Sequence, residues 1–127
     1  MKDMSMDIVE KTIANLSKTI ETDEINNIRC IALVTVSGYE VVCYVDYTDM
    51  PTDAEALAEE DIISFDTLEN YYRSVAQTVR KSKLFQHDKT NIVTYDPEKG
   101  VDFQYEASDC VDSLFIESWI KSIEASV

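Results

Sequence analysis

Residues 28–47 constrain the fold more than any other part of the sequence. Two runs rich in Val, Ile and Tyr, at residues 28–36 and 39–47, are separated by Ser37-Gly38. β-Branched and aromatic residues favour strands, and a two-residue connection that contains Gly is typical of a hairpin. Both alternating faces of the first run are apolar, so we expect a central strand that is covered on both sides.

Helical spacing of apolar residues predicts three main helices. Apolar residues recur every three or four positions near residues 6–22, 66–84 and 109–125, as on the buried side of an amphipathic helix. Asp66 and Glu69 have the spacing of a capping box at the start of the second helix. Its predicted apolar stripe is Leu68, Tyr72, Val75 and Val79.

A second hairpin follows the second helix. Residues 91–95 and 101–105 resemble strands, and the Pro and Gly between them are typical of a turn. Before that helix, Asp49-Met50-Pro51 is expected to end the first sheet segment. The acidic connector after it has a capping pattern that allows a short helix near residues 53–60.

The order of these elements predicts the fold class. A chain of 127 residues suits one domain, here residues 1–127. The order α-β-β-α-β-β-α predicts a single α+β domain, in which a mostly antiparallel four-strand sheet of two hairpins is packed by three main helices.

The charge of the chain is strongly negative and uneven. The formal net charge is −14, and residues 30–72 contain ten acids and no Lys or Arg. Nucleic acids and anionic membranes are bound through Lys and Arg, so neither is an expected partner. A basic protein is. Part of the asymmetry has a structural explanation, because Asp66 and Glu69 would cap a helix.

Cysteine usage and the start of the chain predict a cytoplasmic protein. Cys30, Cys43 and Cys110 are odd in number and lie among apolar residues, which favours buried, reduced thiols over disulfides. The first residues lack the apolar segment of a signal peptide. No apolar run is long enough to cross a bilayer.

The sequence offers little for catalysis. His87 is the single histidine, and with two glycines there is no Gly-rich loop for a phosphate. The spacing of Asp46, Asp49 and Asp53 does not fit a calcium-binding loop, which needs ligands at alternate positions and a Gly at the sixth. We therefore predict no catalytic residue, no cofactor and no metal, and a protein that is not an enzyme.

The candidate binding surface is the end of the first hairpin with the connector after it. Tyrosine is enriched at protein interfaces because it offers contact area and a polar tip. Among the tyrosines, Tyr44 and Tyr71 are assigned to the surface and Tyr72 to the core, and an inward orientation of Tyr39 and Tyr47 stays open. The predicted partner-binding residues are the acids Asp46, Asp49, Asp53, Glu55, Glu59, Glu60 and Asp61, with Tyr44 and Tyr47 as anchors.

In layout the chain resembles immunity proteins of bacterial toxin–immunity systems, including those of contact-dependent growth inhibition. The resemblance rests on the strand ending Tyr44-Val45-Asp46-Tyr47, on a hairpin strand that follows Gly100, and on a last helix with Trp119. It implies an antitoxin that binds a cognate toxin domain, often a nuclease with a basic cleft, and acts as a monomer or weak dimer. The acids would then replace phosphates in that cleft.

Two alternatives remain open. Type III secretion chaperones are also small, acidic and α+β, and act as homodimers that hold an unfolded segment. The chain lacks the long leucine-rich stretch expected there, but an exposed apolar groove and a dimer in solution would favour this class. An inhibitor that mimics DNA and acts on a host nuclease or regulator would share the physics of an immunity protein.

Overall fold

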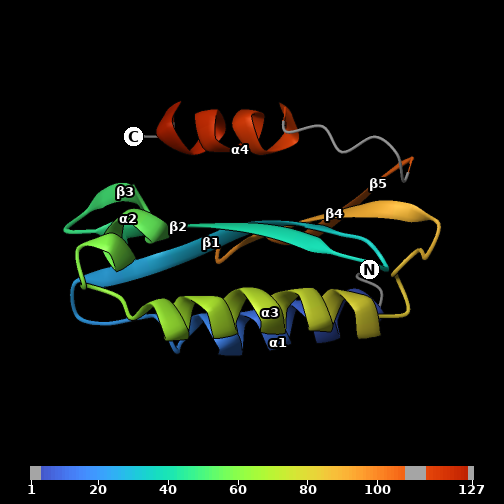
Figure 1. Ribbon diagram of the computed structural model, residues 1–127, viewed down its shortest axis with the longest axis horizontal. Helices are drawn as coiled ribbons and strands as arrows, with labels where there is room; N and C mark the ends of the chain where they lie inside the picture. Colours follow the sequence, from blue (N-terminus) through green and yellow to red (C-terminus); the bar gives the residue numbers. More distant parts are fainter. Residues whose placement is uncertain (1–3, 108–113, 126–127) are drawn as a thin grey trace.

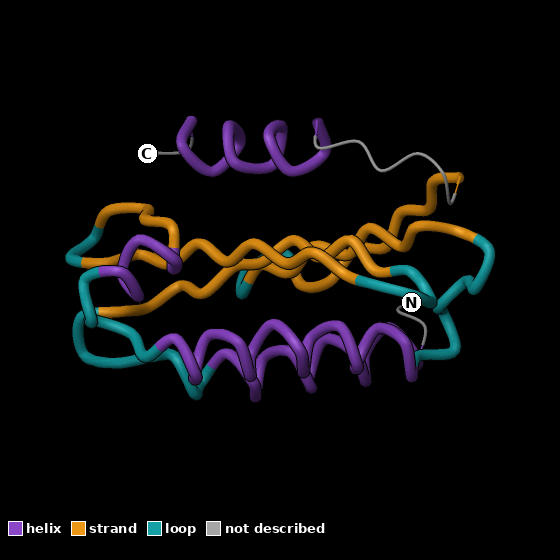
Figure 2. The backbone as a smooth tube through the Cα atoms, viewed as in Figure 1, coloured by secondary structure: helices purple, strands orange, loops and turns teal. Residues whose placement is uncertain are grey.

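The computed structural model describes residues 4–107 and 114–125. An antiparallel five-stranded sheet in the order β3-β2-β1-β4-β5 lies between α1 and α3 on one face and α4 on the other (Figure 1). Figure 2 shows the strands as one layer between these two helical layers. The elements are α1 (Met4–Ser17), β1 (Ile25–Val34), β2 (Tyr39–Tyr47), β3 (Met50–Asp53), α2 (Ala54–Glu59), α3 (Phe65–Lys81), β4 (Lys89–Asp96), β5 (Gly100–Ala107) and α4 (Leu114–Ala125).

The α+β class and the antiparallel sheet are confirmed, but the sheet has five strands, and the order is α-β-β-β-α-α-β-β-α. The expectation that the sheet segment ends at Pro51 is wrong. Thr48 and Asp49 both have positive φ, 49° and 67°, so the chain reverses between Tyr47 and Met50 in the tight turn that a hairpin needs. Pro51 is tolerated because β3 is an edge strand.

The connection between β1 and β2 is also longer than the predicted two residues. β1 ends at Val34, and the N–H of Thr35 donates to the Gly38 carbonyl at 2.9 Å, so residues 35–38 form the loop. Arg80 of α3 donates to the carbonyls of Thr35 and Gly38, at 2.9 and 2.8 Å. One of the few basic side chains is therefore used to hold this loop against α3.

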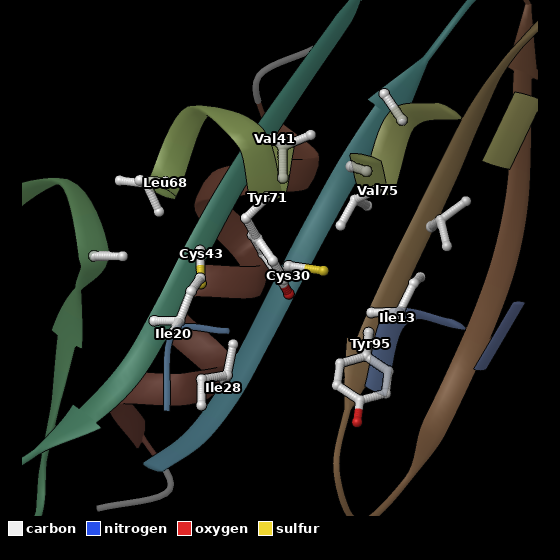
Figure 3. Packing of buried hydrophobic residues seen from close by; sticks show 14 of the residues in the cluster. Ile13, Ile20, Ile28, Cys30, Val41, Cys43, Leu68, Tyr71, Val75 and Tyr95 are labelled. Atoms are coloured by element: carbon white, nitrogen blue, oxygen red, sulfur yellow. The ribbon is translucent and has the colours of Figure 1, made fainter. Parts of the chain in front are cut away.

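The larger core lies between the sheet and the α1–α3 layer (Figure 3). Tyr71 is only 2% exposed and forms a hydrogen bond with Ser17 at 3.2 Å, so its assignment to the surface is wrong. The physical reason is helical spacing, since residue 71 lies between Leu68 and Val75 on the buried side of α3. Tyr72 is half-buried and packs against the same core.

The two described cysteines belong to this core. Cys30 and Cys43 are buried free thiols that lie opposite each other on β1 and β2. Burial raises the pKa of Cys30 to about 12, which keeps the thiol protonated and unreactive. Cys110 lies outside the described residues.

Among the elements of residues 4–107 and 114–125, α4 is the one that covers the second face of the sheet. Ile31, Leu33 and Ile92 of the sheet form a small buried cluster with Ile116 of α4. β1 is therefore covered on both sides, as its two apolar faces predict. The part of the predicted last helix before Leu114 lies outside the described residues. None of the described helices is long and apolar enough to cross a membrane.

Candidate functional site

The topology gathers the predicted partner-binding residues around the β3 edge of the sheet, where β2, β3 and α2 meet (Figure 1). Their side chains nevertheless differ in burial and in role. The positions are β2 for Tyr44, Asp46 and Tyr47, the β2–β3 turn for Asp49, the N-cap of α2 for Asp53, α2 for Glu55 and Glu59, and the segment after α2 for Glu60 and Asp61.

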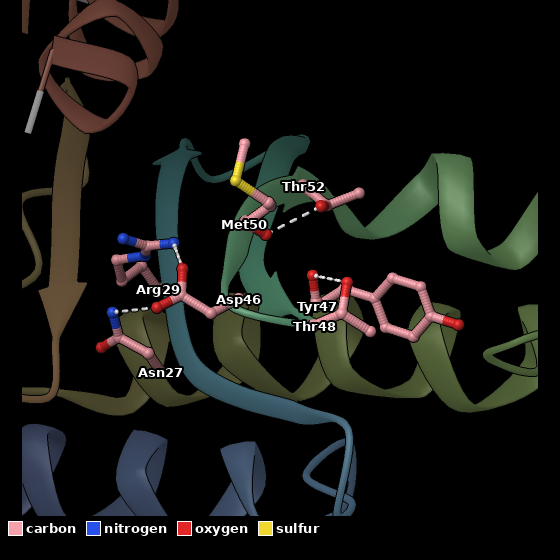
Figure 4. Close-up of polar contacts among 7 residues, drawn as sticks. All are labelled: Asn27, Arg29, Asp46, Tyr47, Thr48, Met50 and Thr52. Carbon is pink, nitrogen blue, oxygen red and sulfur yellow. Dashed lines mark hydrogen bonds and ion pairs between the residues drawn. The ribbon is translucent and has the colours of Figure 1, made fainter. Parts of the chain in front are cut away.

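Asp46 is partly buried and paired within the fold. Its carboxylate pairs with the guanidinium of Arg29 at 2.7 Å and accepts a hydrogen bond from the Asn27 amide at 3.1 Å (Figure 4). Arg29 is 6% exposed, and a buried guanidinium without a carboxylate partner is costly. Asp46 therefore neutralises Arg29 and is not a free charge for a partner.

Three further acids serve the backbone of this region. Asp49 occupies a positive-φ position of the β2–β3 turn. Asp53 caps α2, because its side chain accepts from the N–H of Glu55 at 3.0 Å. Asp61 has φ 62°, and the N–H of the next residue, Ile62, donates to Leu57 at 2.9 Å, as in a Schellman ending. These positions explain part of the acid density without any partner.

Two of the acids that remain, Glu55 and Glu59, form a like-charged group with Glu40 and with the capping residue Asp53. Glu55 and Glu59 are exposed on α2. The pKa of Glu55 is raised, first by partial burial and then by the negative charges of Asp53, Glu59 and Glu40. Among the described residues, none of the groups that shift it is a Lys or Arg. We call Glu40, Asp53, Glu55 and Glu59 the acidic corner.

Glu40 was missed in the sequence because it lies far from α2 along the chain. It stands opposite Leu33 in the β1–β2 register, which places it on the α4 face at the exposed end of β2. Packing of α2 beside β2 then brings its charge near Glu55. Only the tertiary fold brings these two charges near each other.

The two predicted aromatic anchors lie on opposite faces of β2. Tyr44 is half-buried against α4, with its ring centroid 5.8 Å from that of Trp119 in an edge-on arrangement. Tyr47 packs against the core on the α1–α3 side. The structure therefore does not bring Tyr44 and Tyr47 together on one contact surface.

Exposed apolar side chains beside α2 were also missed. Ile62 is 37% exposed, and Phe65, at the start of α3, is 53% exposed. Large apolar side chains next to charged ones are typical of interface anchors with a polar rim. No pattern signalled the exposure of Phe65, because it lies three residues before Leu68, at the spacing of the apolar stripe.

A separate groove runs along α1 and α3, on the side away from the sheet. Its volume is about 690 Å³, and it is lined by mostly apolar side chains of α1 and by polar side chains of α3 and of the segment after it. Met4 and Ile8 on its α1 wall are 78% and 59% exposed. Lys81 and Lys83 lie in its lining, and none of the described lining residues is acidic.

Comparison with known proteins gives no relative, since no family model, curated protein or solved structure matches the chain. Among the described residues, no group of three His, Cys, Asp or Glu side chains could hold a metal ion. The site is thus defined by its geometry and charge alone.

Proposed function

We propose that the protein is a cytoplasmic immunity protein that binds a basic toxin domain, in particular a nuclease, through the acidic corner. The observation that carries this proposal is the grouping of four carboxylates where α2 packs beside β2 and β3. Partial burial and then these neighbouring charges raise the pKa of Glu55. Repulsion among these charges is relieved when Lys or Arg side chains of a partner approach.

Charge and apolar contact would contribute differently to such a complex. Carboxylates at an exposed edge accelerate encounter with a basic surface, and their effect weakens with salt. Ile62 and Phe65 are exposed apolar side chains that follow α2 in the chain, and in such a complex they would supply apolar area and slow dissociation. In a nuclease, the carboxylates would occupy the cleft in place of substrate phosphates.

Co-expression with a toxin domain encoded beside this gene tests the proposal. The wild-type protein should protect cells, and the double variant Glu55→Lys/Glu59→Lys should lose most of that protection. Asp88→Lys/Glu98→Lys makes the same change in net charge at exposed residues outside the acidic corner. Equal protection by both variants would contradict a role for the acidic corner.

The α1–α3 groove favours a second candidate, a chaperone-like protein that acts as a homodimer and holds an unfolded segment. Its support is the exposure of Met4 and Ile8 on an apolar wall. Sedimentation would reveal a dimer, and Ile8→Lys would abolish binding of an unfolded segment. A monomer whose binding is unaffected by Ile8→Lys would exclude this function.

A further inference from the structure

The two edges of the sheet are built differently. β3, at one edge, has four residues, includes Pro51 and leads directly into α2. β5, at the other edge, has eight residues and contains neither Pro nor Lys. Short length, Pro and Lys are features that keep an edge strand from pairing with another chain. The β5 edge has none of these three.

One hydrogen bond identifies the backbone groups of β5 that face away from β4. The N–H of Val101 donates to the Glu10 carboxylate of α1 at 3.0 Å. Because outward and inward groups alternate along an antiparallel strand, the N–H and C=O of Phe103 and Tyr105 also point outward. Within residues 4–107 and 114–125, no backbone bond outside the β4–β5 ladder reaches these two residues. β5 therefore continues past Glu10 as an open edge.

The side chains of β5 give this edge two distinct faces. Val101 and Phe103 pack against the core on the α1–α3 side. Asp102 and Glu106 point to the other face, where their neighbours on β4 are the uncharged Thr94 and Thr90. The edge is thus apolar on one face and negative on the other.

A second copy of the chain is a poor partner for this edge. If two β5 strands pair with Phe103 of one copy opposite Tyr105 of the other, each Asp102 lies opposite the Glu106 of the other copy. Like charges directly opposite each other destabilise a strand pair, whereas opposite charges stabilise it. The same two acids therefore disfavour self-pairing and favour a basic strand.

We propose that β5 is a docking edge for an extended basic segment of another protein, which adds a strand to the sheet. Backbone hydrogen bonds to Phe103 and Tyr105 supply affinity, and Lys or Arg side chains opposite Asp102 and Glu106 supply selectivity. The acidic corner lies at the other edge of the sheet, so this surface does not depend on the proposed function.

A short peptide of alternating Val and Lys tests the proposal, with the same peptide carrying Glu in place of Lys as control. Binding is followed by amide chemical shifts and by calorimetry. We expect the Lys peptide to shift the amides of β5, and Tyr105→Pro to weaken its binding about tenfold by removing one outward N–H. Tyr105→Phe loses the hydroxyl, with its bond to the Leu84 carbonyl, but keeps the outward N–H, so it should bind like wild type.

A charge swap keeps the test decisive if Tyr105→Pro does not fold. Asp102→Lys/Glu106→Lys should bind the Glu peptide in preference to the Lys peptide, while Glu55→Lys/Glu59→Lys should leave both affinities unchanged. Equal binding of the Lys peptide to Tyr105→Pro and Tyr105→Phe would overturn the proposal. Shifts confined to α2, or a concentration-dependent dimer that Tyr105→Pro disrupts, would overturn it too.

Discussion

The two faces of the sheet differ in how much core they bury and in the charge they carry. On one face, α1 and α3 cover a continuous core that reaches from Val9 to Val101. On the other, α4 covers a small cluster around Ile31 and Ile92. The register also places Glu40, Asp53 and Asp102 on this second face.

The two faces therefore contribute differently to the stability of the fold and to its surface charge. Folding energy comes mostly from the α1–α3 side, because buried apolar area is its main source. The basic residues of α3 lie on that side as well, with Arg80 holding the β1–β2 loop. On the α4 side, Asp46 is paired with Arg29, whereas no ion pair among the described residues involves Glu40, Asp53 or Asp102.

The largest expected effect is the loss of unfolding free energy when a core isoleucine is truncated, and this loss should differ between the two cores. Ile13, fully buried under the sheet, and Ile116, 8% exposed on α4, present the same side chain in different settings. Ile13→Ala should lower the free energy of unfolding by about 4 kcal/mol and Ile116→Ala by about 2 kcal/mol. Chemical denaturation measures both. Equal losses would show that α4 contributes as much to stability as the α1–α3 layer.

The next largest loss of stability is expected at Asp46, because its charge on the α4 face is also needed by the fold. Asp46→Ala leaves the buried guanidinium of Arg29 unpaired and should cost roughly 2–3 kcal/mol of unfolding free energy. Asp102→Ala removes an exposed carboxylate on the same face and should change stability by less than about 0.5 kcal/mol. If both variants were equally stable, the ion pair would not be needed by the fold.

A smaller effect, of opposite sign, is expected at the end of α2. Asp61 has φ 62°, a conformation that Gly adopts without steric cost. Asp61→Gly should therefore stabilise the protein by about 0.5–1 kcal/mol, whereas Asp61→Ala should not. Thermal unfolding of the two variants distinguishes them. A less stable Gly variant would mean that the Asp61 side chain itself holds the turn.

The smallest effect concerns pH and the acidic corner. Because the pKa of Glu55 is raised in the folded state, the folded protein holds this proton more tightly than the unfolded chain. The resulting stability is present below the ordinary value of 4.5 and is lost as the pH rises through the folded pKa. Glu55→Gln should be more stable than wild type at neutral pH, with the difference shrinking in acid. A difference that does not depend on pH would contradict this electrostatic origin.

Local patterns predicted most of the fold. The alternation in β2 and the turn residues between β4 and β5 give both hairpins, and the two apolar faces of β1 correctly predict cover on both sides. β3 was not predicted because the turn before it has no typical sequence. Thr48 and Asp49 adopt positive φ there, where Gly or Asn is usual.

The site was less predictable because its chemistry is set by contacts between distant residues. From the sequence, Asp46 is interpreted as an unpaired acid. In the structure, an irregularity in β1 between Asn26 and Arg29 places the guanidinium of Arg29 beside it. Glu40 joins the acidic corner only through the packing of α2 beside β2. Charge density along a chain cannot separate acids that serve the fold from acids that remain unpaired.

The dependence of the association rate on salt tests the acidic corner most directly. The wild type, Glu55→Lys/Glu59→Lys and Asp88→Lys/Glu98→Lys would be compared in stopped-flow binding to a basic toxin domain. We predict that the corner variant associates roughly tenfold more slowly than the matched control at low salt, and that its rate depends less on salt. Identical rates and salt dependence in the two variants would contradict the central claim.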